Sequence, residues 1–187
     1  MTLLTSGFFQ QLTLAGQCFT GTAPIAGVDV PVSSGTTPVF MLWNPTGSGV
    51  NIVVNNLMIS NIDATTPVVS GLAFGYTTGA GNSAATGSVV ATFTAGTKTN
   101  CLIGGGLSSR VFFASASSGT TLTAATTTFI PVGLSHDSVT AGTGWQVVNQ
   151  NFLGSLALAP GSLIHLVGSA AQTQNLMPSI TWAEVPV

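Results

Sequence analysis

The chain has very little charge. Only 3% of its 187 residues are Asp, Glu, Lys or Arg, where an ordinary globular protein has about a quarter. This scarcity excludes most catalytic chemistry, because general acids, general bases and metal ligands come mainly from titratable side chains. Two cations are also too few to neutralise the phosphates of a nucleic acid, so no nucleic-acid partner is expected. The six charged residues are Asp29, Asp63, Asp137, Glu184, Lys98 and Arg110.

Long hydrophobic runs are missing as well. Gly, Ser, Thr or Asn interrupts every apolar run well before the roughly 20 residues that a membrane-spanning helix needs, so we expect no membrane partner. The first residues, from Met1 to Phe9, include no basic segment and no clear cleavage site. We therefore expect no secretory signal.

Cysteine is scarce too. Cys18 and Cys101 are far apart in the chain and lack metal-ligand spacing. They could pair, but the favoured interpretation is two buried, small hydrophobic residues. The two histidines and four acids show no metal-ligand spacing either, so we expect neither a metal nor a cofactor.

Strand-forming sequence fills most of the chain. Thr, Val, Ile and Phe are abundant, Gly and Pro recur at short intervals, and no apolar stripe of helical period persists beyond two turns. This pattern predicts about ten short strands and hence an all-β fold, an antiparallel β-sandwich of jelly-roll type. The predicted strands are 2–14, 38–43, 50–60, 68–76, 88–94, 110–114, 121–132, 144–148, 152–158, 163–168 and 179–185.

The sequence predicts that the chain has two parts. Residues 1–37 are predicted to be an N-terminal strand or extended arm followed by an extended connection, Gln17–Thr37, and residues 38–187 to be the sandwich domain. Pro160 and Gly161 stand where a type II turn prefers them, so 152–168 is the clearest predicted hairpin. The Gly-rich segments 79–87 and 133–144 are predicted to be loops.

Few residues are candidates for a functional site. His136, Asp137 and Ser138 have the residue types of a catalytic triad, but adjacent residues do not normally form its geometry. We interpret them as a polar loop tip, in which His136 and Asp137 are candidate ligand or partner contacts. Trp145 lies in a glycine-containing segment and is the third candidate contact, with ordinary packing as the alternative. His165 lies in an apolar strand and is interpreted as a hydrogen-bonded sheet residue.

The acids give weaker signals. A glycosidase needs two carboxylates on opposite sides of a sugar, and Asp29 and Asp63 are the only candidates for such a pair. Both are better explained as turn residues that bond their own backbone. Trp43 and Trp182 lie in apolar strand sequence and are expected in the core or at an interface. We therefore expect that the protein is not an enzyme.

Three segments carry a resemblance to a known group. They are Phe40–Gly49 with its Asn-Pro-Thr-Gly-Ser-Gly element, Phe152–Leu163 with alternating apolar residues before Pro-Gly, and the closing strand Ser179–Val187 with Trp182 and Glu184. Together they resemble small tailed-phage virion proteins of the capsid decoration (cement) or head-fibre type. The resemblance implies a trimeric β-sandwich on the outer surface of a phage capsid, bound to the major capsid protein.

The low charge agrees with that expectation. A surface with almost no Lys gives weak electrostatic protection against the pairing of exposed strand edges, and such edges are safest inside an oligomer or a larger assembly. The main hypothesis is thus a structural protein that stabilises a capsid by binding on or between coat subunits. The alternative is a phage tail or fibre domain that binds a host surface glycan or protein through segments 79–87 and 133–144.

Overall fold

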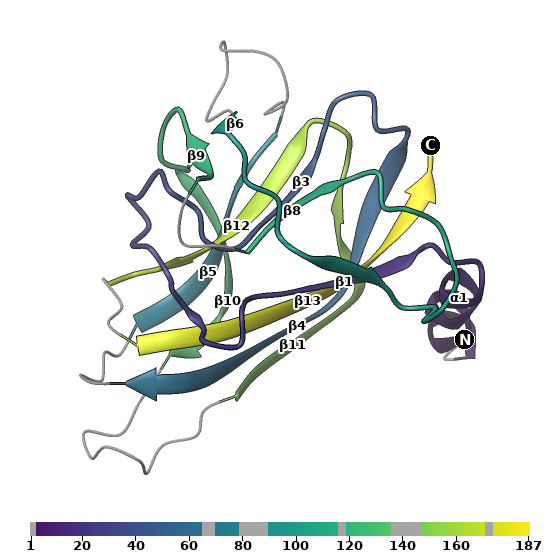
Figure 1. Cartoon of the computed structure of the whole chain (residues 1–187), viewed down its shortest axis with the longest axis horizontal. Helices are drawn as coiled ribbons and strands as arrows, with labels where there is room; N and C mark the ends of the chain where they lie inside the picture. The colour runs from purple at the N-terminus through teal and green to yellow at the C-terminus, as the bar shows by residue number, and fades with distance from the viewer. Residues whose placement is uncertain (1–2, 65–69, 79–89, 116–118, 136–146, 171–173) are drawn as a thin grey trace.

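A computed structural model of the chain describes residues 3–64, 70–78, 90–115, 119–135, 147–170 and 174–187. Within these ranges it contains one helix and thirteen strands, and every pairing between strands is antiparallel (Figure 1). The single helix is α1 (Leu3–Leu14). A small two-stranded sheet pairs β6 (Val90–Thr92) with β9 (Thr121–Leu122).

Two large sheets make up the body of the molecule. The six-stranded sheet has the order β11 (Val147–Leu158), β4 (Val50–Ala64), β13 (Gln174–Pro186), β1 (Cys18–Thr22) and β7 (Lys98–Asn100), and β2 (Val28–Asp29) also pairs with β13. The five-stranded sheet has the order β10 (Thr128–Ser135), β5 (Ser70–Thr77), β12 (Ser162–Gly168), β3 (Met41–Asn44) and β8 (Phe112–Ala114).

One hydrophobic core lies between the two sheets. Trp182 of β13 is fully buried, and its ring stacks on Phe19 of β1 and on Phe113 of β8, with ring centroids 6.0 Å apart in each pair. Phe113 also meets Phe40 edge-on at 5.2 Å. Because these rings come from both sheets, they join the layers across the core. The predicted all-β antiparallel sandwich is therefore confirmed, and its jelly-roll connectivity stays a prediction.

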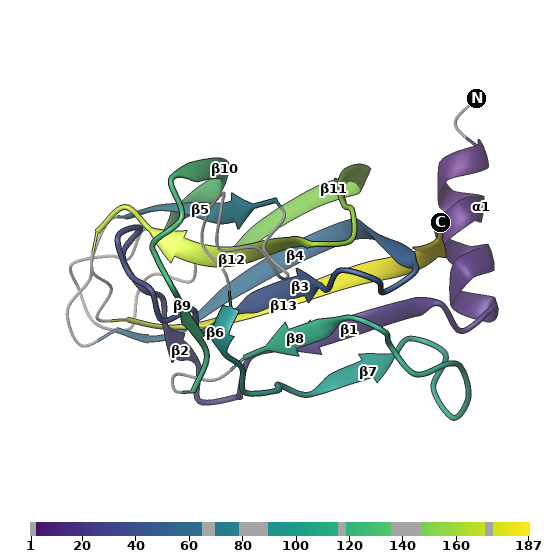
Figure 2. The same cartoon turned by 90° about the horizontal axis from the view of Figure 1, so that it is seen from above.

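The N-terminal residues differ from the prediction. The strand or extended arm predicted at residues 2–14 is wrong, because residues 3–14 form helix α1. The helix ends in a Schellman motif, in which Gln17 N–H donates to Leu12 C=O (2.8 Å) and Gly16 N–H donates to Thr13 C=O (2.9 Å). Gly16 has a φ of 72°, which glycine adopts without strain. Both chain ends lie at the same end of the sandwich (Figure 2).

The segment Gln17–Thr37 was expected to be an extended connection, but it holds two strands of the six-stranded sheet. β1 lies between β13 and β7, and its register runs from Cys18 opposite Ala183 to Thr22 opposite Ser179. Gly21 of β1 is required by packing, since a Cβ there would lie 2.6 Å from the ring of Phe113. Residues 18–22 are therefore part of the sandwich.

Other strand boundaries shift by smaller amounts. Of the strands predicted at 144–148 and 152–158, residues 147–148 and 152–158 fall in a single strand, β11, and residues 144–146 lie outside the described residues. β11 bulges where Asn151 pairs with Asn56 and the next pair is Leu156 with Val54. The segment predicted as one strand at 121–132 contains both β9 and the start of β10. The short strand β7 was not predicted.

The turn predicted at Pro160 and Gly161 is confirmed, but the predicted hairpin is wrong, because β11 pairs with β4 in the six-stranded sheet and β12 pairs with β3 and β5 in the five-stranded sheet. The turn carries the chain from one sheet to the other, and the Asn-Pro turn next to it explains part of the sequence motif. Ser162 N–H donates to Ala159 C=O at 3.1 Å, and Gly161 has a φ of 89°, as a type II turn requires. The fully buried Asn44 donates its side-chain amide to the carbonyls of Val50 (2.8 Å) and Leu158 (2.9 Å). One amide thus ties the 45–49 turn to the end of β11.

The sheet edges are protected by their geometry. On one side of the sandwich the edge strands β7 and β8 have only three residues each. On the other side β11 and β10 are longer, but both contain irregularities, at residues 151–156 and at Pro131/Gly133. Short, bulged or proline-containing edges resist pairing with another sheet, so this chain does not depend on charge or on an oligomer for that protection.

Candidate functional site

The three residues predicted to contact a ligand or partner, His136, Asp137 and Trp145, lie outside the described residues. The two acids weighed as a pair, Asp29 and Asp63, are in register with the same residue, Asn175 of β13, from its two sides. Two strand spacings separate them, roughly 10 Å between Cα atoms. Both are strand residues, not the turn residues that the sequence suggested.

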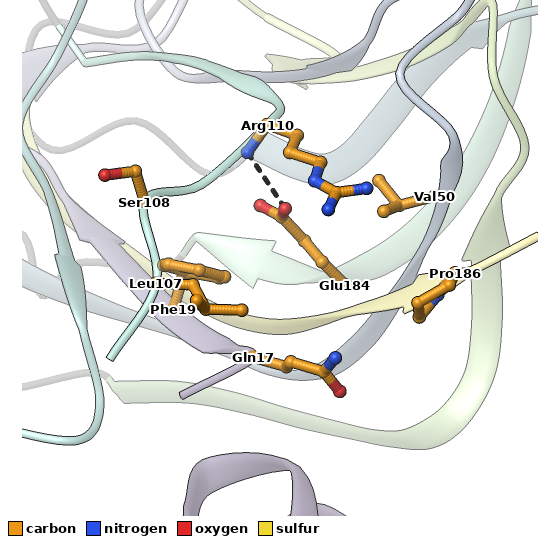
Figure 3. Close-up of a pocket in the computed structure, with 8 residues that line it drawn as sticks. All are labelled: Gln17, Phe19, Val50, Leu107, Ser108, Arg110, Glu184 and Pro186. Atoms are coloured by element: carbon orange, nitrogen blue, oxygen red, sulfur yellow. Dashed lines mark hydrogen bonds between the residues drawn. The ribbon is translucent and has the colours of Figure 1, made fainter. Parts of the chain in front are cut away.

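Glu184 is the most enclosed acid among the described side chains, with 4% exposure. It points from β13 toward the segment before β8, and Figure 3 shows its carboxylate beneath the backbone of Arg110. Its Oε2 accepts the Arg110 N–H at 2.9 Å, and its Oε1 accepts the Ser109 hydroxyl at 2.5 Å and the Trp182 indole N–H at 3.4 Å. These bonds compensate the burial of the charge and fasten residues 109–110 to the sheet.

Both cations of the chain lie in this region. Lys98 of β7 donates to the carbonyl of Val111. Burial lowers the pKa of Lys98, and the opposing effect of the Glu184 charge is smaller. The guanidinium of Arg110 lies near Val50 in Figure 3. Half of the chain's six charged residues thus gather around the end of β13, where their contacts serve the fold.

A cavity beside Glu184 is too small for a substrate. It measures about 20 Å³ and is lined by Gln17, Phe19, Leu107, Arg110 and Glu184, among others. That volume suits about one water molecule. So small a space leaves no room for a reactant beside the hydrogen-bonded carboxylate. Glu184 is therefore better explained as a structural residue than as a catalytic one.

His165 is buried in β12 as the sequence suggested, but only half of its imidazole is hydrogen-bonded. Its Nε2 lies 3.0 Å from the Thr126 hydroxyl, whereas Nδ1 has no hydrogen-bond partner among the described residues. Burial lowers the pKa of His165 to about 4. The side chain is therefore neutral at physiological pH, and its tight packing against Gly75 leaves no open position for a ligand.

A second, larger cavity of about 180 Å³ lies between the ends of β5, β10, β11 and β12. Its walls include Tyr76, Ile130, Leu156 and Leu163, and no carboxylate, imidazole or thiol is among its lining residues. It can accept an apolar group, but it lacks the acid–base chemistry of an active site. Among the described residues no three His, Cys, Asp or Glu side chains lie close enough to hold a metal ion.

The outward side of the six-stranded sheet is the most extensive candidate surface. Residues opposite each other on antiparallel strands point to the same face, and three successive rows on this side contain only uncharged side chains. We call these twelve residues the neutral face: Asn151, Asn56, Thr181, Thr20 and Thr99 in the first row, Asn149, Met58, Ser179 and Thr22 in the second, and Val147, Ser60 and Met177 in the third.

The neutral face is exposed or partly exposed between two boundaries. At one end helix α1 covers the sheet: Cys18 and Ala183 point outward but are buried, and the Cys18 thiol lies 3.7 Å from the Phe9 carbonyl. At the other end lies the Asn175 row with the exposed Asp29. Within the neutral face the polar groups bond one another, as in Thr22 Oγ1 to Ser179 Oγ at 3.0 Å.

Sequence reasoning missed this surface. The alternation that exposes Ser179 and Thr181 and buries Ile180 and Trp182 was visible in the sequence, but the neighbours of each residue depend on strand order and register.

Among the described residues no helix has the length and apolarity needed to cross a membrane. Comparison of the chain with protein-family models, curated proteins and solved structures found no match.

Proposed function

We propose that this chain is a structural protein of a tailed-phage virion. It decorates and stabilises the capsid by binding coat subunits on the outer surface. The neutral face is the observation that carries the structural role. The phage setting, the coat partner and a homotrimeric state rest on the sequence resemblance of Phe40–Gly49, Phe152–Leu163 and Ser179–Val187.

The chemistry of the neutral face suits protein contact. Its hydroxyl, amide, thioether and aliphatic groups can be buried without desolvating an ion, which is the most costly step in forming a charged interface. Its hydroxyls and amides can pair with polar groups of a partner, and its Met and Val side chains add apolar area. A wide, uncharged surface of this kind fits a passive packing role.

Stabilisation would follow from mass action. A protein that binds the assembled capsid and not the free coat subunits shifts the equilibrium toward the capsid by an amount set by its affinity and concentration. No chemical step is required. This agrees with the structural role of Glu184.

Quantitative mass spectrometry of virus particles from the source of the chain tests the proposal. The proposed function predicts a copy number near that of the major coat protein, or a simple fraction of it. A few copies per particle would overturn capsid decoration and favour the tail or fibre alternative. Absence from the particles would overturn the virion role itself.

A further inference from the structure

The two cysteines, far apart in the sequence, are opposite each other in the six-stranded sheet. Cys18 is the first residue of β1, and Cys101 follows the last residue of β7. The β1–β7 register pairs Phe19 with Asn100, so one further step pairs Cys18 with Cys101. A hydrogen bond from Cys101 N–H to the Cys18 carbonyl, 2.9 Å long, continues the ladder to this pair.

This placement suits a disulfide. Residues directly opposite on antiparallel strands have Cα atoms about 4.5–5.5 Å apart and side chains on the same face. Disulfides span Cα separations of about 4.4–6.8 Å. The two thiols also influence each other: burial raises the pKa of Cys101, and the neighbouring Cys18 raises it further. The backbone therefore needs no large movement to bring the two sulfurs together.

We propose that Cys18 and Cys101, which are free thiols in this structure, form an internal disulfide when the protein meets a small-molecule disulfide such as oxidised glutathione. This inference goes beyond the proposed function and does not depend on it. The bond would fasten the edge strand β7 to β1, next to helix α1.

The chemistry is a two-step thiol–disulfide exchange. Cys101 is the more exposed thiol, so its thiolate attacks the small disulfide, forming a mixed disulfide and releasing one small thiol. The Cys18 thiolate then attacks the Cys101 sulfur and releases the second small thiol. The protein loses two protons and two electrons, and the small disulfide gains them. Burial raises the pKa of both thiols, so the exchange should accelerate with rising pH.

The disulfide would reinforce the loop 102–108, which few contacts hold in place. The Asn100 side chain donates to the carbonyls of Gly16 (2.6 Å) and Leu107 (3.0 Å), and Leu107 N–H donates to the Gly16 carbonyl (3.3 Å). Apart from these bonds the segment 102–108 is largely exposed. A covalent link would close a chain loop of about 80 residues and restrict the unfolded state.

The test uses the full-length protein, kept at pH 8.5 with either oxidised or reduced glutathione. We expect the oxidised sample to lose 2 Da without adding glutathione, to yield a linked Cys18–Cys101 peptide, and to melt roughly 5–10 °C above the reduced sample. Cys101→Ser is the control variant, and it should lose both the mass change and the Tm difference. Comparing oxidised with reduced wild type keeps the test valid if the variant fails to fold.

Three results would overturn the proposal. One is a mass that stays unchanged while both thiols still react with N-ethylmaleimide after unfolding. Another is a disulfide-linked dimer in place of the internal bond. The third is an oxidised monomer that melts below the reduced protein.

Discussion

At the scale of single residues, the few strongly polar groups of this chain serve the fold. Asn44 uses its amide to join the 45–49 turn to Leu158 at the end of β11, and Glu184 joins β13 to residues 109–110. Both residues belong to the motifs that carry the phage resemblance. The physical reason for those motifs in this protein is therefore the pairing of polar groups: Asn44 donates to backbone carbonyls, and Glu184 accepts from backbone and side-chain donors.

Replacement of Glu184 tests its structural role. Glu184→Gln keeps the shape but loses the charge and places an N–H₂ group among donors, so we expect the free energy of unfolding to fall by about 1–3 kcal/mol. Urea unfolding measures this loss. Asp29→Asn removes an exposed carboxylate and should change stability by less than about 0.5 kcal/mol. Equal effects of the two substitutions would contradict the account of Glu184.

His165 gives stability a pH dependence. Its folded pKa of about 4 lies below the ordinary value of 6.5, so the unfolded state binds the proton more tightly. Its contribution to stability is complete above pH 6.5 and is lost as the pH falls toward 4. We expect wild type to lose about 2 kcal/mol between pH 7.5 and pH 5 in urea unfolding.

The chain's other histidine supplies the matched control for this prediction. His165→Gln should flatten the dependence between pH 7.5 and pH 5, whereas His136→Gln should keep it. If the slope disappears with His136→Gln and survives His165→Gln, the assignment to His165 is wrong.

At the scale of elements, the clearest sequence signal for helix α1 is the glycine that ends it. It has no acidic residue in its first turn and no basic residue in its last, so the usual charge signals of a helix are missing. Gly16 is the strongest helix signal in the sequence, since it forms the Schellman motif. A Cβ at this position would lie 2.6 Å from the Cα of Gly106.

Two glycines of this region allow a paired experiment. Gly16→Ala should lower the free energy of unfolding by more than about 1 kcal/mol, because both the positive φ and the contact with Gly106 disfavour a side chain. Gly7→Ala, within α1 and with open space around its Cβ, should raise it by about 0.5–1 kcal/mol. Thermal or urea unfolding checks both. The opposite pair of signs would contradict the helix assignment.

The elements that the sequence predicted well have a clear local signal. Strands β4, β12 and β13 alternate or are continuously apolar, and the Pro160–Gly161 turn has specific chemistry, so these were found from local sequence. Strand β1 was missed because Gly21 interrupts its pattern, for a reason that lies in the distant ring of Phe113. The neutral face was missed for the same kind of reason, since it exists only once register joins five strands.

At the scale of the whole molecule, the sequence suggested that low charge leaves the strand edges unprotected, and the structure shows that it does not. The edges are protected by short and bulged strands, so unprotected edges give no argument for an assembly. The neutral face gives a better one. Without charged groups, association through this face would not be steered electrostatically, and it should depend little on ionic strength.

The most direct test of this account is co-sedimentation of the purified protein with particles from which it has been stripped. Wild type should bind with similar affinity at 50 and 500 mM salt. Thr181→Lys places an unpaired charge in the middle of the first row of the neutral face and should weaken binding more than tenfold. Thr127→Lys, an exposed position outside that face, should bind as wild type does. Wild-type affinity for a folded Thr181→Lys variant, or binding that collapses at high salt, would contradict the central claim.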